Sequence, residues 1–205
     1  LAKKKARHNV EALAPWVDEG YRIAVINPTC SLMMRQEYGE LLDDPADREL
    51  AENAKKVAEA TRDLGELLHQ MRKQGQFRED FKSTPGAQIA YHAPCHLRMQ
   101  NIGFRGRDLI KRIPGVKPKL VVECCGHDGT WAMKKEYFEL AKKNGRKAFD
   151  GMQQVEADVW STDCPLASLQ FEQFCGKSPL HPVEVLDRAY REDGFPQRIE
   201  TEERE

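Results

Sequence analysis

The feature of this sequence that most constrains its fold is the alternation of short apolar runs with longer amphipathic stretches. The apolar runs predict strands at residues 22–26, 88–92, 119–122 and 157–161. The amphipathic stretches predict helices at residues 1–17, 32–42, 46–74, 106–112, 134–154, 165–174 and 182–190. Strands that alternate with helices are typical of an α/β fold, in which mainly parallel sheets are flanked by helices.

Five of the six cysteines come shortly after a predicted strand. They are Cys30, Cys95, Cys124, Cys125 and Cys164. The carboxyl ends of parallel strands lie along one edge of a sheet, which is where ligand crevices form. We therefore expect these thiols, which are far apart in the chain, to meet at one rim of the fold. Cys175 lies late in a predicted helix and is expected to pack as a small buried apolar side chain.

A weak internal repeat suggests how the chain is divided. The order helix, strand, cysteine, helix occurs twice, and the tetrapeptide Leu-Ala-Lys-Lys lies near the start of the helical stretch in both copies. This layout predicts tandem repeats of which the first is truncated. The expected parts are the second half of a first repeat at 1–45, a helical connector at 46–84, a complete second repeat at 85–190 and a fraying polar tail at 191–205.

Composition and missing motifs narrow the range of functions. The chain has 32 basic and 33 acidic residues, so no global field attracts nucleic acid. No apolar run approaches the roughly 20 residues that cross a bilayer, and the pattern of a secretory signal is absent. We therefore expect a reducing cytoplasm, where clustered cysteines more often serve metal or redox chemistry than disulfides. The sequence has no glycine-rich nucleotide loop, so flavin or nicotinamide chemistry is expected to belong to a partner.

The cysteine spacing favours an iron–sulfur cluster. The pattern is Cys95, 28 residues, Cys124-Cys125-Gly126, 37 residues, Cys164. Four thiolates are the soft ligands that such a cluster needs. Adjacent cysteines do not easily face one compact zinc ion, whereas a wider cluster offers separate iron corners. Zinc stays open as an alternative, although the paired Cys-x2-4-Cys spacing that zinc commonly uses is missing, as is the Cys-x-x-Cys of thiol–disulfide enzymes.

Residues beside these cysteines are candidates for contacts with the cofactor. Gly126 and Gly129 are expected to let the backbone approach a bulky group, although a tight turn alone would also explain them. Backbone N–H groups of that turn, together with Thr130, are expected to donate hydrogen bonds to cluster sulfurs. His96 and His127 flank ligand cysteines, and a role beside the cluster or at the surface is favoured over ligation.

Two segments carry a resemblance to a known family. They are Tyr-His-Ala-Pro-Cys-His-Leu at residues 91–97 and Cys-Cys-Gly-His-Asp-Gly-Thr-Trp at residues 124–131. Together they resemble the cysteine-rich "CCG" domain, which is found in tandem in one of the subunits of heterodisulfide reductase. The chain also looks like the iron–sulfur subunit of anaerobic glycerol-3-phosphate dehydrogenase. The resemblance spans about residues 1–190, and the second segment is its most specific part.

The resemblance implies a 4Fe–4S cluster and an electron-transfer role in an oxidoreductase complex. The implied ligands are Cys95, Cys124, Cys125 and Cys164, with Cys30 as a ligand of the truncated copy or a contributor to a shared crevice. The implied partner is a flavin-dependent dehydrogenase or another redox subunit, with a quinone-linked membrane partner beyond it. The implied location is cytoplasmic, peripheral at the inner membrane through such a partner.

One departure from the family bears on the type of cluster. The family often ends each copy with Cys-x-x-Cys. Here the position of the second cysteine is taken by Met33, three residues after Cys30, and by Ala167, three residues after Cys164. The non-cubane cluster of heterodisulfide reductase uses a fifth cysteine per site, so the sequence favours a simple cubane. Two alternatives remain at this point: a zinc-stabilised structural or interaction module, and a heterodisulfide-reductase-like disulfide reductase.

Overall fold

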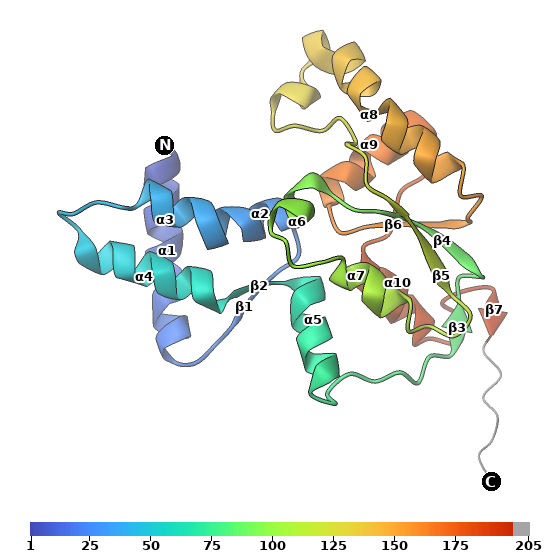
Figure 1. Ribbon diagram of the computed structural model, residues 1–205, viewed down its shortest axis with the longest axis horizontal. Helices are drawn as coiled ribbons and strands as arrows, with labels where there is room; N and C mark the ends of the chain where they lie inside the picture. Colours follow the sequence, from blue (N-terminus) through green and yellow to red (C-terminus); the bar gives the residue numbers. More distant parts are fainter. Residues whose placement is uncertain (199–205) are drawn as a thin grey trace.

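The computed structural model describes residues 1–198 (Figure 1). Residues 199–205, the end of the expected polar tail, lie outside the described residues. The chain forms a largely helical unit from residues 1–73 and an α/β unit from residues 83–198, and the two lie side by side. Among residues 1–198 we find no helix with the length and apolar character that a bilayer crossing needs.

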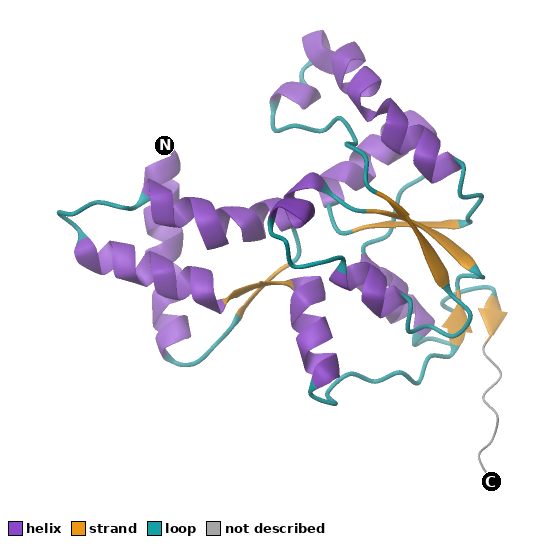
Figure 2. Cartoon of the chain, viewed as in Figure 1, coloured by secondary structure: helices purple, strands orange, loops and turns teal. Residues whose placement is uncertain are grey.

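The α/β unit is organised around a sheet of three parallel strands in the order β5–β4–β6 (Figure 2). These strands are β4 (Gln88–His92), β5 (Lys117–Val121) and β6 (Val159–Thr162). Side chains of the central strand alternate between the two faces. Ile89 and Tyr91 belong to one apolar core, and Ala90 belongs to another. The sheet therefore has a buried layer on each side.

Helices cover both faces of this sheet. Helices α7 (Arg105–Ile110) and α10 (Pro182–Ala189) pack on the face of Tyr91. Helices α8 (Phe138–Gln153) and α9 (Pro165–Cys175) pack on the opposite face. The predicted class, an α/β fold with parallel sheets flanked by helices, is confirmed.

The helical unit has a separate, smaller sheet. Its elements are α1 (Ala2–Asp18), β1 (Ile23–Val25), α2 (Pro28–Leu32), η1 (Met33–Glu37), α3 (Tyr38–Leu41), α4 (Arg48–Ala60), β2 (Thr61–Asp63) and α5 (Leu64–Lys73). Strand β1 pairs in parallel with β2 and does not join the main sheet. The predicted strand at 22–26 thus exists, but it does not share an edge with the other three predicted strands.

Strand β2 divides the helix that was predicted at residues 46–74. The backbone of Thr61 is extended, with ψ at 131°, and its hydroxyl donates to the carbonyl of Val57 at 2.6 Å. Asp63 accepts from the N–H of Gly65 at 3.1 Å and so caps the start of α5. Helix α4 packs with α1 in the core of the helical unit. The expectation of one continuous helix here is therefore wrong.

Short elements complete the described chain. They are β3 (Ser83–Thr84), α6 (Cys95–Met99), η2 (Trp131–Met133), η3 (Lys135–Tyr137) and β7 (Gln197–Arg198). Strands β3 and β7 pair in antiparallel fashion. The expected polar tail is therefore attached to the fold as far as residue 198.

The order of elements in the two units is similar. In the helical unit, α1, β1 and α2 are followed by β2, which pairs with β1 and leads into α5. In the α/β unit, α8, β6 and α9 are followed by Leu180, which forms a parallel bridge with Ser161 of β6 and leads into α10. This layout is what a truncated tandem repeat predicts, and the repeat itself stays a prediction.

The two units meet where α5 packs on α7, and Gly65 allows this close approach, while Gly106 on α7 is itself closely packed. A Cβ added at Gly65 would lie 2.9 Å from the backbone nitrogen of Gly106. A Cβ added at Gly106 would lie 2.5 Å from Oδ1 of Asp163 and 2.6 Å from Cγ of Pro182. Asp163 is buried and accepts a hydrogen bond from the hydroxyl of Tyr91. Neither glycine therefore has room for even one extra methyl group. Gly65 meets α7 across the seam, and Gly106 meets Asp163 and Pro182 within the α/β unit.

We expect Gly106→Ala to destabilise the protein by about 1–3 kcal/mol, because the added methyl overpacks the contact of α7 with Asp163 and Pro182. Urea unfolding of the reduced protein measures this change. The matched control is Gly39→Ala, since a Cβ at this exposed helical glycine meets nothing within 4 Å. The control is expected to be neutral, or more stable by at most about 1 kcal/mol. Equal stability of Gly106→Ala and the wild type would contradict the described packing.

The buried carboxyl group of Asp63 is predicted to make the free energy of unfolding depend on pH. Burial raises the pKa of Asp63 to about 6, whereas an unfolded aspartate titrates near about 4. Between these values the folded state binds more protons than the unfolded state, so the free energy of unfolding falls as pH rises.

Asp63→Asn removes this dependence and keeps a side chain that caps helices well. We expect the stability of the variant relative to the wild type to increase by about 2 kcal/mol between about pH 4 and pH 6. Urea unfolding across this range measures the difference, and a constant difference would refute the assignment.

Candidate metal centre

Each strand of the main sheet leads directly to a cysteine. Strand β4 leads to Cys95 at the start of α6, β5 leads to Cys124 and Cys125, and β6 leads to Cys164 at the start of α9. The register places the last residue of β4, His92, opposite Val121 of β5. The same residue lies opposite Thr162 of β6. Because the three strands end level with one another, their cysteines emerge at the same edge.

The four thiols interact with one another. The side chains of Cys95 and Cys124 are in hydrogen-bonding contact. Cys125 lies within electrostatic range of both Cys95 and Cys164, and Cys164 lies within range of Cys95. The structure therefore brings together these four predicted ligands from three strand ends.

The site has a buried side and an open side. Cys125 and Cys164 are 7% and 8% exposed and belong to the core beneath α8 and α9. Burial raises the pKa of Cys125 to about 11 and raises the pKa of Cys164 as well. Cys95 is half-buried and Cys124 is exposed. One pair of thiols thus belongs to the interior and the other pair faces solvent.

A cation and a shared proton polarise the solvent-facing pair. The hydrogen bond from Cys124 lowers the pKa of Cys95 to about 5, and Arg98 adds to this effect with Nη2 at 3.4 Å from the sulfur. The same contact raises the pKa of Cys124. In the metal-free protein, Cys95 is therefore the thiolate of this pair and Cys124 is the thiol. The thiolate is the form that binds metal.

Backbone N–H groups point at the sulfurs. Cys164 occupies the N-cap position of α9, where the nearby N–H groups of Leu166 and Ala167 partly offset the rise of its pKa by burial. Cys125 accepts from the N–H of His127. The N–H of Gly126 donates to Cys124 at 3.4 Å. Such donors stabilise thiolates and tune the reduction potential of iron–sulfur clusters.

Gly126 has a packing role that the sequence did not reveal. Its φ is +79°, and a Cβ there would lie 2.1 Å from the carbonyl oxygen of Ala141 and 2.9 Å from the nitrogen of Gly145. The turn that holds the two adjacent cysteines therefore rests backbone to backbone on α8. Gly129 has φ at +57° but faces open space, and Thr130 is exposed. Contacts of Gly126, Gly129 and Thr130 with a cofactor stay predictions.

The three histidines near the site each have protein partners. His92 is fully buried between Thr162 and the carbonyl of Glu123, with both ring nitrogens at 3.0 Å from their partners. Burial lowers its pKa to about 4, so it is a neutral structural residue. Nδ1 of His96 lies 2.7 Å from the hydroxyl of Thr29. Nδ1 of His127 lies 3.4 Å from Nε2 of Gln170, a residue that the sequence analysis missed.

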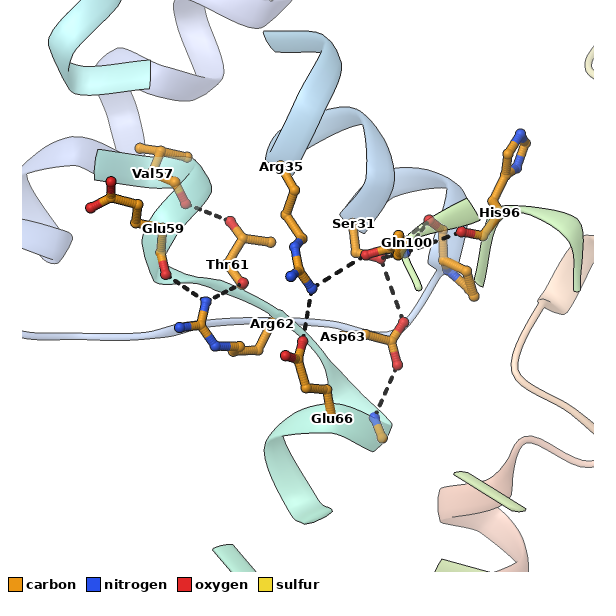
Figure 3. Close-up of polar contacts among 12 residues, drawn as sticks. Ser31, Arg35, Val57, Glu59, Thr61, Arg62, Asp63, Glu66, His96 and Gln100 are labelled. Atoms are coloured by element: carbon orange, nitrogen blue, oxygen red, sulfur yellow. Dashed lines mark hydrogen bonds and ion pairs between the residues drawn. The ribbon is translucent and has the colours of Figure 1, made fainter. Parts of the chain in front are cut away.

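Cys30 differs from the other four predicted ligands because it follows β1 of the smaller sheet. It is exposed, and it lies on α2, which packs against α6. Figure 3 shows how Gln100 joins these helices. Its Nε2 donates to the carbonyl of Pro28 at 3.1 Å and to the hydroxyl of Ser31 at 2.8 Å. Cys30 therefore lies on a helix that packs against the helix beginning at Cys95. Its role as a ligand stays a prediction.

The donor set fits a cluster of several metal ions better than one ion. Within residues 1–198, no three His, Cys, Asp or Glu side chains are arranged to hold a single metal ion. In an iron–sulfur cluster each thiolate binds a different iron, so the ligands stand further apart than around one zinc ion. Four neighbouring thiols with N–H donors and one open side match that requirement.

Comparison with known proteins agrees with the site. Residues 89–172, which contain Cys95, Cys124, Cys125 and Cys164, match the family model of a cysteine-rich domain, CCG. The chain is 28% identical over 192 residues to a subunit of the anaerobic glycerol-3-phosphate dehydrogenase of Escherichia coli K12, and the match covers 92% of this chain and 46% of that protein. The same subunit of the Escherichia coli O157:H7 enzyme matches equally. The chain thus spans about half the length of the curated relatives it matches.

We expect Gly126→Ala to lift the turn of the adjacent cysteines off α8. The close contact and the positive φ together cost about 2–5 kcal/mol, and Cys125 becomes accessible. Thiol labelling of the metal-free protein under native conditions, followed by peptide mass analysis, detects this exposure.

Gly129→Ala is the matched control for that variant. Gly129 also has a positive φ, but a Cβ there would meet nothing within 4 Å. We therefore expect this variant to lose only about 1–2 kcal/mol of stability and to leave Cys125 protected. Equal labelling of Cys125 in the two variants would show that the contact with α8 does not hold the turn.

Proposed function

We propose that this chain, whose residues 89–172 form a cysteine-rich domain, is an iron–sulfur electron-transfer subunit or domain of an oxidoreductase complex. The observation that carries the proposal is the convergence of four thiols from three parallel strand ends. The similarity to a dehydrogenase subunit supports the same conclusion.

The proposed cofactor is one 4Fe–4S cluster held by Cys95, Cys124, Cys125 and Cys164. Bound there, such a cluster takes up and releases single electrons. Cys125 and Cys164 would anchor it on the core side, where α8 and α9 exclude water. Cys95 and Cys124 would hold it on the exposed side, next to the cation of Arg98. Cys30, on the neighbouring α2, is proposed as an additional thiolate at the edge of the site.

The exposure of one ligand bears on how electrons would reach the site. Cys124 is exposed, so a cofactor held by it would lie close to the protein surface. A partner can then transfer electrons without opening this domain. We propose a flavin-dependent dehydrogenase or another redox subunit as that partner, with a quinone-linked membrane partner further along. A peripheral position at the inner membrane would follow from such a complex.

Anaerobic reconstitution with iron and sulfide tests the proposal. We expect the wild type to hold about four irons and four sulfides per chain and to turn brown. Cys124→Ser is expected to lose most of the iron, because one cluster corner loses its thiolate. Cys175→Ser is the matched control, since this thiol lies at the opposite end of α9 from Cys164. It is expected to keep the wild-type iron content.

Three outcomes would contradict the iron–sulfur proposal. The first is a colourless protein with stoichiometric zinc, which would establish the structural zinc module instead. The second is an equal loss of iron in Cys124→Ser and Cys175→Ser. The third is a reconstituted protein with no bound iron. A cluster that binds a thiol substrate directly, seen by electron paramagnetic resonance, would point to the disulfide reductase.

A further inference from the structure

Gln170 is a buried polar residue that the proposed ligand set does not explain. It lies on α9 and is 5% exposed. One helical turn earlier, Ala167 belongs to the apolar core that also contains Cys125 and Cys164. Its Oε1 has no hydrogen-bond partner among the described residues. Leaving a buried amide group unpaired costs about 1–3 kcal/mol. A group placed at this cost calls for a specific reason.

The contacts of Gln170 connect it to the turn of the adjacent cysteines. Its Nε2 lies 3.4 Å from Nδ1 of His127, and the backbone N–H of His127 donates to the sulfur of Cys125. The helix that carries Gln170 begins at Cys164. One carboxamide thus joins the two segments that present the buried thiols.

The orientation of the amide decides whether the unpaired group is an acceptor or a donor. The oxygen and nitrogen of a glutamine amide are assigned from their surroundings. With the amide turned by 180°, its oxygen accepts from the N–H of His127 Nδ1, and its NH2 group takes the position of the unpaired oxygen. In either orientation the one described partner of the amide is the ring of His127.

We propose that Gln170 is a positioning residue of the metal centre that acts through the ring of His127. It holds this ring, and with it the turn that carries Cys125, against α9. This inference rests on the proposed iron–sulfur function, but the contact with His127 exists without metal and can be tested separately.

The test uses the full chain and the variant Gln170→Met, which nearly keeps the shape of the side chain but removes the amide. In the metal-free protein, long-range 1H–15N spectra report the tautomer of the His127 ring. We expect a single tautomer in the wild type and a mixture in Gln170→Met. In the reconstituted protein, a redox titration followed by electron paramagnetic resonance should give a lower midpoint potential for the variant, because hydrogen-bond donors favour the more negative, reduced cluster.

The control is Thr84→Val, which removes another buried atom without a partner, the hydroxyl of Thr84. Strand β3, which contains Thr84, lies before the amino end of β4, away from the cysteines (Figure 1). We expect wild-type ring signals and a wild-type potential in this control. Should Gln170→Met fail to fold, Gln170→Glu keeps an acceptor for the ring, and a single His127 tautomer in this variant supports the proposal, whereas a mixture refutes it.

The proposed function and the role of Gln170 fail in different ways. If the wild type takes up no iron, the proposed function is refuted, and the ring spectra of the metal-free protein still decide whether Gln170 positions His127. If the wild type takes up iron but Gln170→Met has the same ring spectrum and the same potential, the role of Gln170 is refuted and the iron–sulfur function stands.

Discussion

The parallel pairing of β4 with both β5 and β6 is the constraint on which the rest of this structure depends. Because all three strands run in one direction and end level at His92, Val121 and Thr162, the segments that follow them emerge at one edge. Every proposed ligand of the α/β unit lies within four residues of such an end. The site is thus a consequence of topology, since no local motif gathers these four thiols.

Helices convert that edge into a site with two different sides. The first turn of α9 directs N–H groups at Cys164, and the packing of Gly126 on α8 buries Cys125 beneath it. Cys95 and Cys124 stay on the open side, near Arg98. This combination suits the proposed electron-transfer role, because the buried side would fix a cofactor and the open side would let a partner approach it.

The helical unit is joined to the α/β unit by polar contacts, by close backbone approaches and by Leu68 of α5, which packs against the apolar core of the α/β unit. Gly65 and Gly106 bring α5 onto α7, and Gln100 holds α2 to α6. Since α6 begins at Cys95, the position of the helical unit bears directly on the site. The buried carboxyl group of Asp63 at this seam makes its stability sensitive to pH.

The sequence by itself determined the three strands of the main sheet, the four helices that cover its faces and the four cysteines that follow its strands. Apolar runs are local signals, and the run at residues 88–92 predicted β4 at its observed bounds. The parallel topology then places the residues that follow each strand at one edge of the sheet. Only the tertiary structure decided that β1 pairs with β2 in a separate sheet, and that the helix predicted at 46–74 is interrupted at Thr61. It alone showed that Gly126 rests on α8, and that Gln100 and Gln170 join segments 72 and 43 residues apart. These features depend on which surfaces meet in space, and a pattern of neighbouring residues does not contain that information.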